Sequence, residues 1–282
     1  MLERWKMERG IFEIVDTESL APKEHLLRKI DAAVDFNEIY DMVEPLYCAD
    51  NGRRGADLSH PRRLQEFRAQ MRQGEDVCRI VAAGDFSPEH YRAYAGTHPA
   101  ALLIAADAGY RYLHRLGVEP DLFVGDTDSL GFRPDGVPCV LLPSVKDDTD
   151  TISALREGLK RGFRRFEIFG ALGGKRLSHS LANLQALLFL KERQADGVLI
   201  DEHCTVCALC GSGDRRTVAP NRFFSIFAAT ESAVVSIADA KYPLERHRLT
   251  SAFPLGASNE SAAVPATVTL VDGSVFLVIE PK

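Results

Sequence analysis

The sequence predicts an α/β protein whose doubly wound, mostly parallel sheet is followed by a small all-β sandwich or barrel. From Cys78 onward, short apolar runs alternate with segments of helical period, which is typical of a parallel sheet with helices on both faces. From about residue 203 the helical period disappears and short strands follow. Residues 1–75 are rich in charge and contain apolar residues at helical spacing. We therefore expect a helical N-terminal extension over 1–75, an α/β domain over 76–202 and a β domain over 203–282.

Apolar runs and helical segments follow one another through the predicted α/β domain. The strands are expected at 79–83, 101–106, 122–124, 139–142, 166–169 and 198–200. The helices are expected near 88–95, 109–116, 150–161 and 179–194. Ligands bind beyond the carboxyl ends of the strands in such sheets. Asp107, Asp126 and Asp128 follow strands and therefore fall at that edge.

The predicted β domain contains one ambiguous motif. Its later strands are expected at 223–228, 233–237, 244–250, 266–271 and 274–279, with Asp272-Gly273 as a hairpin turn. Near its start, Cys204, Cys207 and Cys210 have a spacing that can serve zinc or an iron–sulfur cluster, but a structural zinc site needs four ligands and only His203 is adjacent. Small thiols buried in strands explain the pattern as well, and we favour that interpretation.

Composition and charge exclude several classes of protein. A formal net charge of −6 gives no general attraction to nucleic acid or to an anionic membrane. No apolar run approaches the length of a membrane-spanning helix, and the densely charged first residues do not form a secretory signal. We therefore expect a cytoplasmic protein whose six cysteines are reduced.

Two carboxylates two residues apart follow the strand at 122–124. Alternate residues of an extended chain point the same way, so Asp126 and Asp128 can present oxygens to one Mg²⁺. A polar turn is the plainer interpretation, because Asp, Gly and Ser are ordinary turn residues. Asp107 follows the preceding strand and brings a further carboxylate to the same edge, which favours the metal interpretation.

A further acidic cluster begins at Lys146 and precedes the helix expected at 150–161. Asp148 or Thr149 can cap that helix, and acids near a helix start suit its dipole. Capping accounts for one carboxylate and leaves the others unexplained. We therefore interpret the acids beside Lys146 as groups that bind metal and position phosphates.

A glycine-rich turn follows the strand at 166–169. Glycines let the backbone come close to a ligand there, and the following helix start offers N–H groups to anions. Lys175 and Arg176 add positive charge, while His179 and Asn183 share a helix face. A solvated basic turn is the alternative, and the cluster matches neither the phosphate loop nor the dinucleotide fingerprint. Together with the acids, this turn indicates nucleotide phosphoryl chemistry.

The order of these motifs resembles thiamine pyrophosphokinase (thiamin diphosphokinase) from about Arg79 to the C-terminus. The resemblance rests on Ala105-Ala-Asp-Ala-Gly, Gly125-Asp-Thr-Asp-Ser, Lys146-Asp-Asp-Thr-Asp-Thr, Gly170-Ala-Leu-Gly-Gly-Lys-Arg-Leu-Ser-His, Ala240-Lys-Tyr-Pro-Leu and Gly256-Ala-Ser-Asn-Glu. The family transfers a pyrophosphoryl group from ATP to thiamine with Mg²⁺, giving thiamine diphosphate and AMP. It works as a homodimer with an α/β nucleotide-binding domain and a C-terminal β domain.

The resemblance implies roles for individual residues. Asp126, Asp128 and Asp150 would hold Mg²⁺ and act in catalysis. The ATP site would include Asp107, Lys146, Thr149, Gly173, Gly174, Arg176, Ser178, His179 and Asn183. Tyr242, Ser258 and Asn259 would help to form a thiamine pocket across the dimer interface, where an aromatic face suits the cationic thiazolium.

Ser178 departs from the family pattern, in which many members carry Asp before the histidine. Serine can cap the helix but brings no charge, and we expect the remaining acids to keep the site active. The alternatives are another Mg²⁺-dependent pyrophosphokinase or nucleotide-dependent transferase, and a catalytically weakened protein that binds thiamine or nucleotide.

Residues 1–57 do not fit the kinase. Met7-Glu-Arg-Gly-Ile-Phe-Glu-Ile-Val-Asp and Leu46-Tyr-Cys-Ala-Asp-Asn-Gly-Arg resemble the N-terminal segment of insertion-sequence transposases, and the transposase catalytic region does not follow. We expect a genomic fusion or a misplaced start codon that leaves a helical appendage without transposition activity. A genuine helical extension is the alternative, and the acidic balance argues against a DNA-binding fusion.

Overall fold

The computed structural model describes residues 77–126, 130–132, 134, 136–143 and 147–282. The expectations for residues 1–75, for Asp128 and for Lys146 lie outside these described residues. Among the helices that are described, none is both long enough and apolar enough to cross a membrane.

Parallel strands form one half of a long sheet. They are β1 (Val77–Val81), β2 (Leu102–Ala106), β3 (Leu122–Gly125), β4 (Cys139–Leu141), β5 (Arg165–Phe169) and β6 (Asp196–Ile200). Their order in the sheet is β4-β3-β2-β1-β5-β6, and every neighbouring pair is parallel. β1 and β3 are buried along their whole length, as expected for strands covered on both faces.

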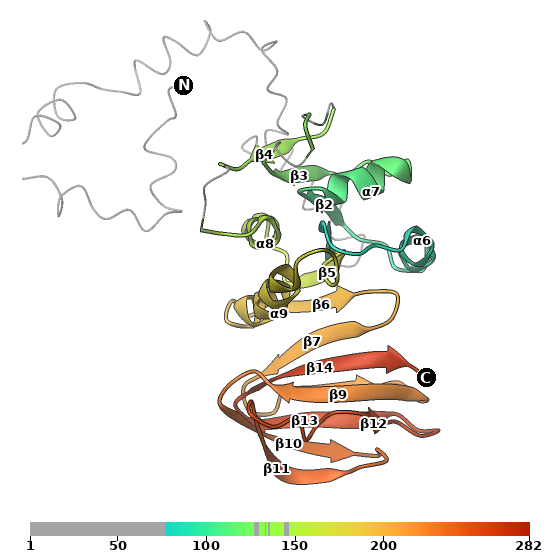
Figure 1. Ribbon diagram of the computed structural model, residues 1–282, viewed down its shortest axis with the longest axis vertical. Helices are drawn as coiled ribbons and strands as arrows, with labels where there is room; N and C mark the ends of the chain where they lie inside the picture. Colours follow the sequence, from blue (N-terminus) through green and yellow to red (C-terminus); the bar gives the residue numbers. More distant parts are fainter. Residues whose placement is uncertain (1–76, 127–129, 133, 135, 144–146) are drawn as a thin grey trace, which may run out of the picture. The chain divides into compact units, whose positions relative to one another are not determined.

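Helices cover both faces of these parallel strands, so the predicted doubly wound arrangement is confirmed. The helices are α6 (Pro88–Thr97), α7 (Gly109–Arg115), α8 (Asp150–Lys160) and α9 (Leu177–Lys191). Leu155 of α8 and Leu187 of α9 pack in one apolar cluster with Ile104 of β2. Tyr91 of α6 and Leu113 of α7 pack in another cluster on the opposite face (Figure 1).

The direction of winding reverses between β1 and β5. The chain passes outward from β1 to β4 and then returns to the other side of β1 with β5. Backbone hydrogen bonds continue beyond this strand pair, from Ala82 N to Phe169 O (2.8 Å) and from Gly84 N to Gly170 O (2.6 Å). Ligands of doubly wound sheets bind at such a reversal point, and the loops that surround it are held to each other here.

The remaining strands build the predicted β sandwich. β7 (Thr205–Cys210), β14 (Ser274–Pro281), β9 (Arg222–Ala228) and β12 (Asn259–Glu260) extend the first sheet beyond β6. β11 (Leu244–Thr250), β10 (Ser232–Ala238), β13 (Ala266–Asp272) and β8 (Arg215–Val218) form a second sheet. Phe224 and Leu277 of the first sheet share an apolar core with Val235 and Val268 of the second. The expected boundary at 202/203 lies in the turn between the paired strands β6 and β7, and the domain division stays a prediction.

The expectation of a hairpin at Asp272-Gly273 is wrong. β13 pairs with β10 and β8, whereas β14 pairs with β7 and β9, so the turn carries the chain from one sheet to the other. Gly273 has a φ of +80° and supports the tight reversal. An Asp-Gly signal describes only this local reversal, because pairing depends on which strand edges are open elsewhere in the fold.

The three closely spaced cysteines point to different parts of the core. Cys204 and Cys210 pack against the cluster beneath α8 and α9, whereas Cys207 lies in the core between the two sheets. Burial raises the pKa of Cys204 to about 11, which keeps the thiol protonated near neutral pH. This arrangement favours the interpretation as small buried side chains.

Candidate active site

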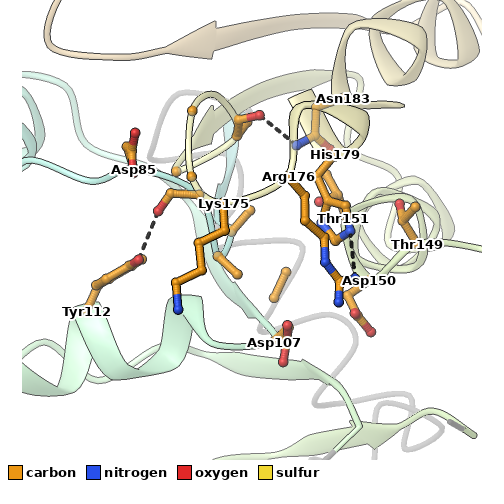
Figure 2. Close-up of a pocket in the computed structure, with 18 of the residues that line it drawn as sticks. Asp85, Asp107, Tyr112, Thr149, Asp150, Thr151, Lys175, Arg176, His179 and Asn183 are labelled. Carbon is orange, nitrogen blue, oxygen red and sulfur yellow. Dashed lines mark hydrogen bonds between the residues drawn. The ribbon is translucent and has the colours of Figure 1, made fainter. Parts of the chain in front are cut away.

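A cavity of about 700 Å³ opens at the point where the winding reverses. Its walls are the loops after β1, β2 and β5, together with the starts of α8 and α9 (Figure 2). This volume lies in the ordinary range for small-ligand sites, about 300–1,000 Å³. The lining residues are Ala82, Ala83, Gly84, Asp85, Ala106, Asp107, Tyr112, Asp148, Thr149, Asp150, Thr151, Gly170, Ala171, Gly173, Gly174, Lys175, Arg176, His179 and Asn183.

The cavity brings together most of the residues expected at an ATP site. Those that line it are Asp107, Thr149, Asp150, Gly173, Gly174, Arg176, His179 and Asn183. Asp126 directly follows β3, and Ser178 lies in the first turn of α9, but neither belongs to the described lining. Tyr242, Ser258 and Asn259 lie in the β part of the chain.

The start of α8 separates the possible roles of its polar residues. Thr149 is the N-cap residue, and its hydroxyl accepts a hydrogen bond from Ile152 N (3.2 Å). Asp148 instead forms an ion pair with Arg156, whose Nε lies 2.7 Å from Asp148 Oδ2. Asp150 lies in the first turn and lines the cavity, where the helix dipole stabilises a negative charge.

The start of α9 has the character of an anion site. Arg176 occupies the N-cap position and provides no side-chain cap, so the expected capping by Ser178 is wrong. The helix begins before Ser178 because Leu177 is already helical. The first N–H groups of a helix that lacks a side-chain cap can bind phosphate. Arg176 Nη1 lies 3.5 Å from His179 Nε2, so a cationic group and an imidazole flank this helix end.

Asn183 holds the glycine-rich turn in place. Its Nδ2 donates a hydrogen bond of 2.7 Å to Ala171 O, and the side chain is buried. This contact ties the second turn of α9 to the loop after β5. It gives Asn183 a structural role within the site, whatever ligand the cavity binds.

Asp107 has an unusual backbone conformation. Its φ is +50°, which is uncommon for a residue other than glycine but is tolerated best by Asp and Asn. Asp107 N donates to Val124 O at 3.0 Å, and a side chain at Gly125 would place its Cβ 3.1 Å from Asp107 Cα. Strand β3 therefore packs closely against the backbone of Asp107 and fixes the point at which the Asp107 side chain enters the cavity.

Asp85 was not predicted from the sequence, and it lines the cavity from the loop after β1. Its position in the sequence could have indicated a site residue, because Asp85 follows an apolar strand and a glycine, much as Asp107 follows a strand. Gly173 allows the close approach of this carboxylate, since a Cβ at Gly173 would lie 2.1 Å from Asp85 Oδ2. Sequence spacing could not bring these two loops together, because they are separated by most of the α/β part.

The carboxylates suit a metal ion that arrives with a substrate. Among the described residues, no group of three or more His, Cys, Asp or Glu side chains is placed to hold a metal ion. Asp107 and Asp150 both line the cavity. Mg²⁺ is usually bound by one or two carboxylates together with water and substrate phosphates. The donor set therefore fits Mg²⁺ bound to a nucleotide.

The residues expected to contact thiamine gather on one surface of the β part. Asn259 is 5% exposed, and its side chain accepts from Tyr242 N (3.0 Å) and donates to Tyr242 O (2.8 Å). Ser258 N donates to Ser225 Oγ at 3.0 Å. The Tyr242 side chain is 56% exposed. Asn259 thus fixes the backbone that presents an exposed aromatic ring.

This surface is remote from the cavity within one chain. β12, which carries Asn259, is separated from β5 by β9, β14, β7 and β6 in the sheet. Neighbouring strands are about 4.8 Å apart, so the separation is on the order of 24 Å. One small molecule cannot contact both regions of the same chain.

Comparisons with known proteins relate the chain to two families. The family model described as thiamin pyrophosphokinase, catalytic domain, matches residues 97–199. The family model described as transposase domain matches residues 15–64. A comparison with curated proteins gave no match.

Solved thiamine pyrophosphokinases have the same fold. The protein from Bacillus subtilis superposes with a TM-score of 0.63 at 23% identity, covering 73% of this chain and 99% of that chain. The protein from Geobacillus thermodenitrificans gives 0.61 at 23% identity, covering 73% and 98%. The yeast protein gives 0.59 at 12% identity, covering 76% and 89%. The motifs, the match over 97–199 and the shared fold together confirm the resemblance to the thiamin pyrophosphokinase family, and the N-terminal resemblance to transposases is confirmed as well.

Proposed function

We propose that this chain is a thiamine diphosphokinase that transfers a pyrophosphoryl group from ATP to thiamine with Mg²⁺. The observation that carries this proposal is the cavity, in which carboxylates from two loops face the glycine-rich turn and two helix starts. Phosphoryl transfer depends mainly on positioning and charge stabilisation, and this set of groups suits both. We expect the activity in the cytoplasm, where ATP and Mg²⁺ are available.

The phosphates of ATP would lie against the starts of α8 and α9. Arg176 offers a planar group of donors that suits phosphate oxygens, and the backbone N–H groups of α9 add further donors. Gly174 lets the phosphates approach the backbone closely, whereas Gly173 of the same turn lies against Asp85. Asp126, Asp128 and Asp150 would hold Mg²⁺, which offsets the phosphate charge when it is bound. Asp107 and Lys146 complete the proposed ATP site.

The reaction forms one bond and breaks one. The thiamine hydroxyl oxygen bonds to the β-phosphorus of ATP, the bond between that phosphorus and the oxygen bridging it to the α-phosphorus breaks, and AMP leaves. The hydroxyl proton passes to a carboxylate of the cavity, for which Asp107 and Asp150 are the described candidates.

We further propose that the enzyme is a homodimer in which Tyr242, Ser258 and Asn259 of one copy face the cavity of the other. The separation of about 24 Å within one chain supports this, because a shared thiamine must then be held by two copies. The β part also exposes large apolar side chains, including Phe253 at 65% exposure. Exposed apolar surface of this kind is typical of interaction sites.

The direct test incubates the purified protein with Mg²⁺, ATP and thiamine and measures AMP and thiamine diphosphate by chromatography. We expect both products in equal amounts, and none when thiamine is omitted or Mg²⁺ is chelated. An Asp150→Asn variant serves as the matched inactive protein. Absence of thiamine diphosphate under these conditions would reject the proposal, and AMP formed with other alcohols instead would point to another pyrophosphokinase.

The division into three regions is also proposed. Residues 1–75 would be an appendage to the kinase, residues 76–202 would bind ATP and residues 203–282 would bind thiamine. A protein that begins at residue 76 should keep nearly all of the kinase activity of the full chain. A large loss, with the truncated protein still folded by circular dichroism, would make the N-terminal region part of the enzyme.

A further inference from the structure

Asp85 is held in the cavity wall by its backbone. Asp85 N donates to Leu172 O at 2.9 Å, and Gly84 N donates to Gly170 O at 2.6 Å. A Cβ at Gly84 would lie 2.6 Å from Leu172 O, so only glycine permits this approach without a shift of the backbone. The loop after β1 and the loop after β5 are therefore fixed against each other, and Asp85 starts from a rigid position.

The Asp85 carboxylate has capacity to accept hydrogen bonds from a ligand. Within the described residues, no donor forms a hydrogen bond or ion pair with this side chain, which is exposed and lines the cavity. Asp148, by contrast, is paired with Arg156. A carboxylate has two acceptor oxygens and no donor when it is ionised.

An ordered aromatic wall lies next to Asp85. Tyr112 OH donates to Gly84 O at 2.9 Å, and the ring stacks on Phe86 with centroids 4.9 Å apart and planes 3° apart. Burial, and then the negative charge of Asp85, raise the pKa of Tyr112, so the phenol stays protonated. This side of the cavity thus combines a flat apolar surface with a free carboxylate.

The two sides of the cavity differ in charge. Figure 2 shows Asp85 and Tyr112 on one side, Arg176 and Asp150 on the other, and the Lys175 side chain between them. The helix starts and Arg176 suit phosphates, whereas an unpaired carboxylate repels them. The Asp85 side therefore suits a part of the ligand that is uncharged and carries hydrogen-bond donors.

We propose that Asp85 binds the ribose hydroxyls of the nucleotide, and that this contact selects ribonucleotides over deoxyribonucleotides. The proposal rests on the proposed function and identifies the residue that orients the nucleoside. Two vicinal hydroxyls offer two donors to the two oxygens of Asp85, and Tyr112 provides a wall for the nucleoside. With the ribose held there, the triphosphate extends toward Arg176 and the starts of α8 and α9.

The test is calorimetric titration of the full chain with ATP, 2′-deoxyATP and 3′-deoxyATP, each with Mg²⁺ and without thiamine. We expect the wild-type protein to bind ATP about 10-fold or more tightly than at least one deoxynucleotide, since hydrogen bonds to a charged acceptor are strong. In Asp85→Ala this preference should fall to about onefold through weaker ATP binding, while Asp85→Asn should keep part of it. Glu89→Gln is the matched control, because it removes a carboxylate from an exposed site nearby and should keep the full preference.

The outcomes separate this inference from the proposed function. Equal affinity of the wild-type protein for all three nucleotides would overturn the role of Asp85 and leave the kinase proposal intact. Equal weakening of all three by Asp85→Ala would also overturn it, because a phosphate or metal contact does not distinguish the sugars. Binding of none of them by the wild-type protein would reject both proposals. Unchanged melting temperatures of the variants confirm that the comparison is between folded proteins.

Discussion

The cavity in the α/β part and the polar surface around Tyr242 in the β part hold their side chains in opposite ways. At the cavity, backbone hydrogen bonds between the loops after β1 and β5 fix the wall, and Asp85 extends from it. At the other surface, the buried side chain of Asn259 fixes the backbone of Tyr242. The wall that carries Asp85 is held by main-chain hydrogen bonds, whereas the backbone that carries Tyr242 is held by one side-chain amide.

This difference explains where each region tolerates change. Asp85 is exposed in the cavity and contributes little to the packing of the protein, so its substitution should affect ligands more than stability. The Asn259 amide belongs to the structure itself, so its substitution should affect stability first. The exposed ring of Tyr242 contributes to neither core and is available to a ligand or a second copy.

The largest effect is expected for Asp107→Asn. Loss of one charge at the centre of the site should lower the rate of thiamine diphosphate formation about 100-fold or more. Asn tolerates the positive φ of Asp107, so the melting temperature should hardly change. Asp121→Asn is the matched control. Asp121 Oδ2 accepts a hydrogen bond from Leu103 N (2.7 Å) near the start of β2, whereas Asp107 follows the other end of this strand. Equal activity losses in both variants would contradict a specific role for Asp107.

Asn259→Ala should give the largest loss of stability among these variants. It leaves the N–H and the carbonyl of Tyr242 without their partner, which costs about 2 kcal/mol or more in the free energy of unfolding. Tyr242→Ala should leave that free energy nearly unchanged and raise the KM for thiamine several-fold. Urea denaturation and steady-state kinetics measure the two effects. A stable Asn259→Ala protein would show that the amide does not hold this surface.

Gly173→Ala tests the contact between the glycine turn and Asp85. A left-handed conformation costs a residue with a side chain roughly 1–2 kcal/mol, and Gly173 (φ +66°) and Gly174 (φ +79°) should both show this cost as alanines. Only the Gly173→Ala methyl group would meet Asp85, at 2.1 Å from Oδ2. We therefore expect Gly173→Ala to lose the preference for ATP over deoxynucleotides, as Asp85→Ala does. Gly174→Ala, whose nearest neighbouring atom lies at 3.5 Å, should retain it.

The smallest effect on stability is expected for the ion pairs that join α9 of the α/β part to the β part. Lys191 of α9 forms ion pairs with Asp196 (2.6 Å) and with Asp214 (2.7 Å), which precedes β8. Burial alone would lower the pKa of Lys191, but its hydrogen bonds to both carboxylates outweigh burial and hold the pKa above the ordinary 10.5. Since the folded-state pKa is raised, the stabilisation is fully present below pH 10.5 and is lost as the pH rises through the folded-state value.

Lys191→Met should therefore cost about 1 kcal/mol or less at pH 8. The difference from wild type should shrink above pH 10.5, as measured by denaturant titration at several pH values. Lys160→Met is the control, because Lys160 is half-exposed and pairs only with Glu157 among the described residues. A difference between wild type and Lys191→Met that grows with pH would contradict this assignment.

Local signals in the sequence were sufficient for most elements of the fold. Alternating apolar runs and helical segments predicted β1 to β6 and α6 to α9. Each of these elements buries apolar residues, and their spacing along the sequence shows whether the element is a strand or a helix. Acids and glycines after strands located Asp107, Asp150 and Gly173, because the carboxyl ends of parallel strands share one edge. Asp85 was not predicted, although it also lies in a loop that follows a strand of the parallel sheet.

The sequence by itself determined the strand and helix periods, the two-part order of the described region and the residues that cluster at one sheet edge. The tertiary structure alone decided that Asp272-Gly273 connects two sheets, that Arg176 rather than Ser178 is the N-cap residue of α9, and that Asp85 lies against Gly173. Periods are local properties of the chain. Pairing, helix starts and contacts between loops depend on which edges and spaces the rest of the molecule leaves open.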